Sequence, residues 1–256
     1  MNTKVFLACV NSVKTTIVPY FKPHYVLESF MRLKSKTNVT REYMNWCLQA
    51  DDFLLDSGAF TFMNKAQNTE NYTDKTLKDY IDSYIEFINT YDIKNFFEMD
   101  IDSVVGYDNV KKIRQYIEEK TNKKVIPVWH ISRGIDDFHS MCKEYKYVAI
   151  GGIAAKEIRP SEHKLLYELC DIAHSYGCKV HGLGYSPLTA LNDRTCPFDT
   201  IDSTSWIGHI RRWYYKLNNG KLEKLKDDDR HWRNLDQDSY QAWIEFSKLP
   251  DVCHGG

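Results

Sequence analysis

Short apolar runs recur along the chain, and each is followed by an amphipathic or polar segment. Several runs are almost continuously apolar, as expected for parallel strands that are buried on both faces. The predicted strands are Val5–Cys9, Phe53–Asp56, Asn95–Asp100, Val125–His130, Tyr147–Gly151, Lys179–Leu183 and Thr200–Asp202. We expect an eighth strand near Tyr214–Leu225.

The segments between these strands have helical periodicity. Apolar residues repeat at three- and four-residue steps in Leu77–Tyr91, and Val110–Glu119 and Ser161–Tyr176 behave similarly. Gly177 is placed to end the last of these helices. Strand–helix alternation predicts a parallel α/β fold, either a barrel or an open sheet. The barrel is favoured because nearly every strand ends in Asp, His or Gly, and in a barrel these ends surround one pocket.

We therefore predict a single-domain, TIM-like (β/α)8 barrel over residues 1–205. Residues 206–256 are more polar, aromatic and mixed in charge, and we expect them to form a helical and hairpin extension packed on the barrel. The length of 256 residues suits one such barrel, which typically has about 250.

Composition narrows the class of protein. Hydrophobic residues make up 43% and no stretch approaches about 18 apolar residues, so we expect a soluble, cytoplasmic protein without a membrane partner. The net charge of −1 requires any nucleic-acid contact to come from a local patch. The seven cysteines are scattered, which indicates reduced thiols.

Three motifs place carboxylates at predicted strand ends. In residues 54–60, Asp56 and Ser57 precede a glycine and then Phe60, a ring that suits a planar base. In residues 96–102, Glu98, Asp100 and Asp102 alternate along one predicted face and need donors, a metal or raised pKa values.

The third motif, residues 198–206, ends a strand at Asp202 before a run of hydroxyl residues. For both Asp56 and Asp202 a helix cap is the competing interpretation.

Two glycine motifs complete the set of strand ends. Residues 147–154 contain Gly151, Gly152 and Ile153, and residues 180–186 contain Gly182. Such turns present bare backbone groups to a ligand, although a tight turn alone also requires glycine.

His130 ends another predicted strand, where a packed histidine is the ordinary interpretation. Cys170, His174, Cys178 and His181 fall within twelve residues, but the predicted helix end at Gly177 separates them, so we predict no metal and no cofactor.

Taken in order, the motifs DSGAF, FEMDID, GGIA, HGLGY and FDTIDS resemble the tRNA-guanine transglycosylase family, across residues 54–203. The resemblance implies a (β/α) barrel that exchanges guanine in a nucleic acid for a 7-deazaguanine. It also implies Asp202 as nucleophile and Asp56 as general acid and base.

The same resemblance implies the base-binding residues. Asp100 would bind the edge of the base and Phe60 would stack on it, while Gly151, Gly152 and Gly182 would line the pocket through their backbone. His130 is our candidate for the position of the family's glutamine. Ser57, Asp102 and Ile153 complete the predicted base-binding set, and Asp102 stands where the family has a cysteine.

The chain lacks the family's CxCxxC zinc module and is shorter than its typical members. In this it resembles zinc-less bacteriophage and bacterial relatives that insert 7-deazaguanines into DNA. DNA is therefore the favoured partner, tRNA is the alternative, and the free 7-deazaguanine base is the small-molecule substrate. A homodimer is a further expectation.

Base exchange has its own physical requirements. A carboxylate that holds the sugar as an ester gives retention by two inversions, and a second carboxylate moves the proton. In a duplex the target base must also leave the stack, which calls for aromatic and cationic contacts. Arg211, Arg212 and Lys216 lie in such a run, whose alternative is an ordinary amphipathic helix and hairpin.

Two other functions use the same residues: a barrel glycosidase or metal-dependent hydrolase, and a non-catalytic nucleic-acid-binding subunit. The presence of both Asp56 and Asp202 argues against the latter, because a pure binding protein does not need paired carboxylates.

Overall fold

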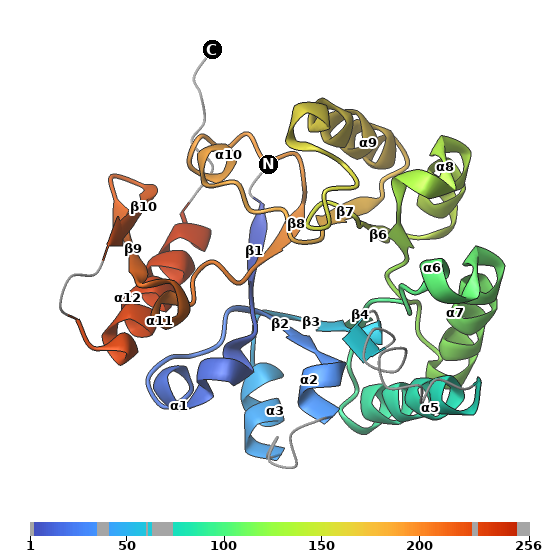
Figure 1. Ribbon diagram of the computed structural model, residues 1–256, viewed down its shortest axis with the longest axis horizontal. Helices are drawn as coiled ribbons and strands as arrows, with labels where there is room; N and C mark the ends of the chain where they lie inside the picture. Colours follow the sequence, from blue (N-terminus) through green and yellow to red (C-terminus); the bar gives the residue numbers. More distant parts are fainter. Residues whose placement is uncertain (1–2, 35–40, 60, 63–73, 227–229, 250–256) are drawn as a thin grey trace.

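The computed structural model of the protein describes residues 3–34, 41–59, 61–62, 74–226 and 230–249. A curled sheet of eight parallel strands forms the centre, and helices surround it on the outside (Figure 1). This arrangement confirms the predicted α/β class and is consistent with a TIM-like barrel.

Strands and helices alternate along the chain. The sheet has the order β4-β3-β2-β1-β8-β7-β6-β5. Its strands are β1 (Lys4–Ala8), β2 (Tyr25–Ser29), β3 (Asp52–Asp56), β4 (Asn95–Phe96), β5 (Val128–Trp129), β6 (Tyr147–Ile150), β7 (Lys179–Gly182) and β8 (Thr200–Ser203). The α-helices between them are α1 (Lys14–Ile17), α2 (Phe30–Lys34), α3 (Arg41–Cys47), α5 (Asp74–Thr90), α6 (Asp102–Val105), α7 (Tyr107–Thr121), α8 (Ile135–Glu144), α9 (Lys164–Ser175) and α10 (Leu188–Asn192). Short 3-10 turns cover Val10–Val13, Ile131–Arg133 and Pro160–Glu162.

The two edges of the sheet meet at one point. Phe97, just after β4, forms an isolated parallel bridge with Ile126, just before β5. The Ile126 N–H donates to the carbonyl oxygen of Phe96 at 2.8 Å, and the Glu98 N–H donates to that of Ile126 at 3.1 Å. This contact is a bridge and not a ladder, so the ring of strands is curled but incompletely closed.

Alternation along the strands separates two cores. One side of the strands packs against the helices in the larger core. The other side fills the interior of the ring with a small apolar cluster of Phe6, Ala8, Leu27, Leu54, Phe97, Ile126, Val128 and Ala149. Because side chains alternate between faces, a residue two positions beyond an interior residue also faces the interior. This rule places the strand-end polar groups above the interior cluster.

The C-terminal part is built from α11 (Gly208–Arg211), the hairpin β9 (Trp213–Asn218) and β10 (Lys221–Lys226), and α12 (Trp232–Ser247). Trp206 anchors the start of this part, since its indole N–H donates to the carbonyl oxygen of Ala8 at 3.1 Å. Tyr240 of α12 packs edge-on against Phe21, with 5.2 Å between ring centroids. Figure 1 shows these elements together on one side of the ring.

One strand prediction was wrong and two were too long; one of these two, the strand predicted over Val125–His130, covers only Val128–Trp129. The eighth strand of the sheet is Tyr25–Ser29, whereas Tyr214–Leu225 lies in the separate antiparallel hairpin. The strand predicted over Asn95–Asp100 covers only Asn95–Phe96. The alternation expected for the carboxylates of residues 98–102 therefore does not hold, and Asp102 is the first residue of α6.

None of the helices within the described residues combines the length and the apolar character needed to cross a bilayer. The six cysteines of the described residues are free thiols, as predicted, and Cys253 lies outside them.

Candidate active site

The carboxyl ends of the strands gather polar groups on the interior side. Asp56 lies two residues beyond interior Leu54, His130 two beyond Val128, and Gly151 two beyond Ala149. Asp202 pairs in register with interior Phe6. Residues from β3, β5, β6 and β8 therefore face one region, as in the active sites of barrel enzymes.

Asp56 is held at the end of β3 by a tight turn. Its Oδ2 accepts a hydrogen bond from the Gly58 N–H at 3.2 Å, and its carboxylate is also bonded to the Ser29 side chain. Gly58 has φ +63°, and a Cβ there would lie 2.5 Å from the Cβ of Met31, so only glycine fits.

The pKa of Asp56 is raised to about 6. Burial is the main cause, the charges of Asp202 and Asp100 add to the rise, and the hydrogen bonds from Ser29 and Gly58 oppose it. The mutual effect indicates that these three carboxylates, far apart in sequence, are near neighbours. A carboxyl that titrates near pH 6 is suited to both donating and accepting a proton.

Asp202 is oriented by backbone and side chain. Its Oδ1 accepts a hydrogen bond from the Gly184 N–H at 2.8 Å and lies 3.4 Å from Nε2 of His181. Gly184 has φ +70°, and a Cβ there would lie 2.8 Å from that of Ala154, so the HGLGY turn requires this glycine.

A charged triplet lies across the ring from Asp202. Nε2 of His130 contacts Oδ1 of Asp100 at 2.8 Å, and its Nδ1 contacts Oε2 of Glu157 at 3.0 Å. Burial lowers the pKa of His130, but the hydrogen bonds and charges of Asp100 and Glu157 outweigh burial and raise it to about 9. His130 is therefore protonated at neutral pH and donates to both carboxylates.

Arg133 supplies the positive charge that balances the three carboxylates of residues 98–102. Its guanidinium lies 3.2 Å from Glu98, 3.7 Å from Asp100 and 3.0 Å from Asp102. Glu98 is fully buried and also binds Arg114 of α7 at 2.7 Å. The cluster is thus an ion-pair network in which one buried cation joins three acids.

The same network bears on metal binding. Within the described residues, one group has metal-ligand spacing: Asp100, Asp102 and His130, whose ligand atoms lie within 4.8 Å of one another. Protonation of His130 and the charge of Arg133 both oppose a cation at this point. Of the four residues weighed for zinc, the two histidines meet other partners: His174 contacts Asp199 at 2.9 Å and His181 contacts Thr200 at 2.7 Å.

The remaining predicted base-binding residues have specific local roles. Ser57 is buried, and its hydroxyl accepts a long hydrogen bond of 3.4 Å from the Ala59 N–H. A Cβ on Gly151 would lie 2.7 Å from the His130 ring, and one on Gly152 would lie 2.5 Å from Glu157. These two glycines make room for the charged triplet.

Gly182 and Ile153 face the outer layer. A Cβ on Gly182 would lie 2.8 Å from the ring of Phe198, and Ile153 is buried in the larger core. Any contact of Gly182 with a ligand is therefore made through its backbone.

The other predicted site residues are Phe60 and the three cations of the C-terminal part. Phe60 and the side chain of Arg211 lie outside the described residues. Arg212 is exposed at the end of α11, and the neighbouring Trp213 indole N–H donates to the carbonyl oxygen of Ser205 at 3.3 Å. This bond places the start of the hairpin beside the carboxyl end of β8. Lys216 is exposed on β9, so the two cations are available to a ligand.

Sequence reasoning missed two groups beside the carboxylates, Cys9 and Ser29. Cys9 follows β1 with φ 65°, and its pKa is raised to about 11 by burial together with the charges of Glu28, Asp202 and Asp56, against the effect of Arg32. Both residues stand at strand ends, the signal that identified Asp56. Ser29 was missed with its strand, and Cys9 was assigned only to a set of reduced thiols.

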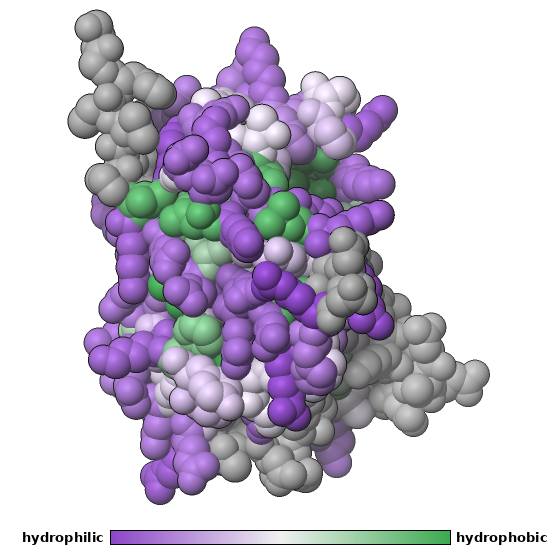
Figure 2. Space-filling model, turned by 90° about the vertical axis from the view of Figure 1, so that its left-hand side faces the viewer, coloured by the Kyte–Doolittle hydropathy of each residue, from purple (hydrophilic) through white to green (hydrophobic). Residues whose placement is uncertain are grey.

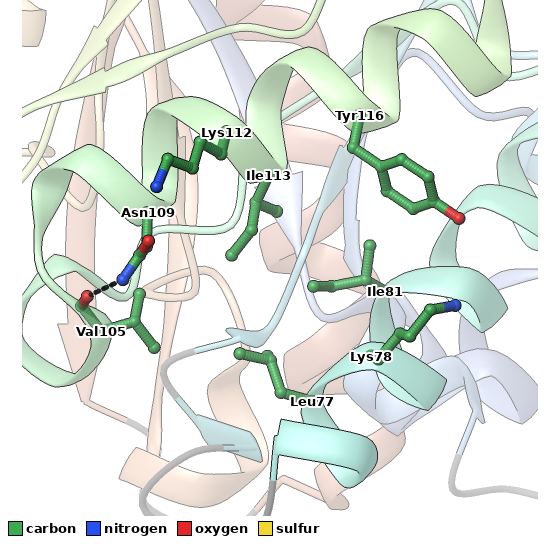
Figure 3. A pocket seen from close by; sticks show the side chains of 8 residues that line it. All are labelled: Leu77, Lys78, Ile81, Val105, Asn109, Lys112, Ile113 and Tyr116. Carbon is green, nitrogen blue, oxygen red and sulfur yellow. Dashed lines mark hydrogen bonds between the residues drawn. The ribbon is translucent and has the colours of Figure 1, made fainter.

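A groove of about 470 Å³ lies elsewhere, on the outside of the ring between α5 and α7. Figure 3 shows Leu77 and Ile81 of α5 facing Ile113 of α7, with Lys78 and Lys112 nearby. The carboxylates described above do not line this groove.

No protein-family model matches the chain, and a search of curated proteins found no match either.

Proposed function

We propose that the protein is a transglycosylase that exchanges guanine in DNA for a 7-deazaguanine base through a covalent Asp202–sugar intermediate. The fold we propose for it is a complete (β/α)8 barrel, with the Phe97–Ile126 bridge as the closing point. The observation that carries the proposal is the pair Asp56 and Asp202: two carboxylates from β3 and β8, close enough for one to raise the pKa of the other.

The first half of the reaction removes guanine. A carboxylate oxygen of Asp202 attacks C1′ of the deoxyribose, and the bond between C1′ and N9 breaks with its electron pair passing to the purine. Asp56, whose pKa is raised to about 6, supplies the proton that the departing base takes up. The products are neutral guanine, an Asp202–sugar ester and the Asp56 carboxylate.

The second half reverses the first with a different base. The Asp56 carboxylate takes the N9 proton of the incoming 7-deazaguanine, and N9 forms a bond to C1′. The ester bond breaks and its electron pair returns to Asp202. Two inversions at C1′ retain the configuration, and no metal or redox partner enters the balance.

The charged triplet suits recognition of the base edge. Asp100 accepts from donors, and guanine and 7-deazaguanines present N–H groups on their Watson–Crick edge. His130 holds Asp100 at 2.8 Å and leaves it 28% exposed, so the carboxylate remains available for one more donor.

DNA contact is assigned to the C-terminal part beside β8. Arg211 ends α11, Arg212 follows it and Lys216 lies in β9 of the hairpin. Figure 2 faces the side of the molecule on which Figure 1 shows α11 and the hairpin, and the surface there is mostly hydrophilic with small apolar patches. Cations on such a surface bind phosphates, which supplies affinity without sequence preference. This assignment keeps tRNA as the alternative partner.

Labelled guanine tests the proposal. We expect the protein to incorporate it into genomic DNA, and Asp202→Ala and Asp202→Asn to abolish incorporation. Asp171→Ala, an exposed change on α9, is the matched control and should leave incorporation unchanged. Incorporation into tRNA but not into DNA would make tRNA the partner in place of DNA. Incorporation by Asp202→Ala would overturn the proposed function.

A metal-dependent hydrolase is the second candidate, favoured by the spacing of Asp100, Asp102 and His130. Chelation separates the two functions. Exchange by the proposed route continues in excess EDTA, whereas a hydrolase that uses this group stops and regains activity when a divalent metal is restored.

A further inference from the structure

A buried chain of hydrogen bonds runs from Asp202 into the interior of the ring. Nε2 of His181 lies 3.4 Å from Oδ1 of Asp202, its Nδ1 lies 2.7 Å from Oγ1 of Thr200, and that oxygen lies 2.5 Å from the hydroxyl of Tyr147. The chain links β8, β7 and β6. His181 has no exposed surface.

The surroundings of His181 are otherwise apolar. The ring centroid of Phe97 lies 5.1 Å away and that of Phe6 lies 6.2 Å away, both from the interior cluster. A buried imidazole in such surroundings needs partners for both nitrogens, and Thr200 and Asp202 are the partners it meets. The arrangement therefore fixes the ring in one orientation.

The direction of the protons follows from the end of the chain. At one end the Asp202 carboxylate can only accept, so Nε2 of His181 is the atom that donates to it. At the other end burial raises the pKa of Tyr147 well above its usual range, so its hydroxyl keeps a proton that it can donate to Thr200. Thr200 then has its single proton free to donate to Nδ1 of His181. This leaves a proton on Nε2 of His181, where it points at Asp202.

We propose that His181 is a positioning residue for the nucleophile: it donates from Nε2 to Oδ1 of Asp202 and leaves Oδ2 to attack C1′. This inference rests on the proposed function. Both hydrogen bonds that the described residues give to Asp202, from the Gly184 N–H and from His181, fall on Oδ1. An oxygen that carries two donors is a weaker nucleophile than its partner, so the geometry separates the two oxygens into a held one and a reacting one.

Two amide substitutions divide the roles of the imidazole nitrogens. The amide nitrogen of His181→Gln reaches the place of Nε2 and keeps a donor toward Asp202. The shorter amide of His181→Asn reaches only the place of Nδ1 and keeps the contact with Thr200. Both variants bury one amide in the same site, so their thermal midpoints should match each other and control for a loss of packing.

The measurement is the rate at which protein–DNA adduct accumulates in a single turnover, quenched in denaturant. We expect His181→Gln to stay within a few-fold of the wild-type rate, and His181→Asn to be slower by about 10- to 100-fold, the effect of losing a hydrogen bond to a charged group. The dissociation constant for DNA should be the same for both variants. Equal rates for the two variants overturn this inference alone, whereas the absence of adduct with the wild type overturns the proposed function as well.

A spectroscopic test does not depend on turnover. Nitrogen-15 NMR of the free protein should show His181 with its proton on Nε2, and Asp202→Asn should shift that signal more than Asp171→Asn. A proton on Nδ1 instead would contradict the inference, because Nε2 then has nothing to donate.

Discussion

Nε2 of His130 lies 2.8 Å from Oδ1 of Asp100, and this contact helps to keep a strand-end histidine protonated at neutral pH. Its pKa of about 9 lies above the ordinary value of about 6.5. We expect NMR titration of the His130 ring to give a midpoint near 9, and Glu157→Gln to lower that midpoint, because one of the two carboxylates at the ring is lost. A midpoint near 6.5 in the wild type would contradict the ion pairs.

The same shift predicts how stability changes with pH. The folded protein holds the His130 proton more tightly than the unfolded chain, so the stabilisation is complete below about pH 6.5 and disappears as the pH rises through about 9. The contribution is at most about 3 kcal/mol. Denaturant unfolding should show a decline over this range that is smaller in His130→Gln.

Asp56 has a shift with the opposite consequence. Its folded pKa of about 6 exceeds the unfolded value of about 3.9, so stability falls as the pH rises from about 3.9 to about 6, and the full cost of the charged form is present above pH 6. Asp56→Asn keeps the contact with Ser29 without the charge, and we expect it to raise the unfolding free energy at pH 8 by about 1–3 kcal/mol while abolishing exchange. At pH 4 the gain should be close to zero. An equal gain at both pH values would contradict a pKa near 6.

Arg133 is the cation on which three acids depend. Replacing it by Met leaves the fully buried Glu98 with Arg114 as its remaining charged partner, and leaves Asp102 without its guanidinium. We expect Arg133→Met to lower the unfolding free energy by about 3–5 kcal/mol, as for other buried ion pairs that lose one member. Arg159→Met, at a side chain that is 74% exposed, is the control and should change it by less than about 0.5 kcal/mol.

The cations beside β8 should act on affinity and not on chemistry. We expect Arg212→Ala and Lys216→Ala each to weaken DNA binding and to reduce the slope of log K against log salt by about 1. Lys94→Ala, at the opposite end of the ring just before β4, is the control. If Arg212→Ala and Lys216→Ala both leave the salt slope unchanged, DNA binds at another surface of the protein.

The sequence predicts the strands whose burial is visible locally. β1, β3 and β6 contain short apolar runs, and these three strands lie where their runs predict them. β7 and β8 are less apolar but also lie within a residue or so of their predicted bounds. β2 was not predicted because Glu28, which is completely buried in the fold, interrupts its apolar pattern. Oε1 of Glu28 accepts hydrogen bonds from the Tyr43 hydroxyl at 2.6 Å and from the Asn11 N–H at 2.8 Å. No local sequence pattern encodes these contacts.

The hairpin was misjudged for a different reason. Alternation in residues 214–225 is that of an antiparallel pair with one covered face, and a single-strand pattern does not distinguish such a pair from a strand of the barrel.

The candidate site, like the fold, was predicted only in part. Asp56, Asp202 and His130 are found from the sequence because barrel strands bring their carboxyl ends together. The contacts that hold the site together were not predicted. Arg133 pairs with the carboxylates of residues 98–102, and His181 contacts Asp202 on the neighbouring strand. Nearness in space depends on the order of strands around the ring, and the sequence does not state that order.

The covalent intermediate is the most direct test of the account. Protein incubated with DNA, quenched in acid and digested should yield one peptide carrying a sugar adduct, with the mass shift on Asp202. Asp202→Ala should yield none, and Asp56→Asn should slow its appearance. An adduct on any other residue, or guanine exchange with no adduct at all, would contradict the account.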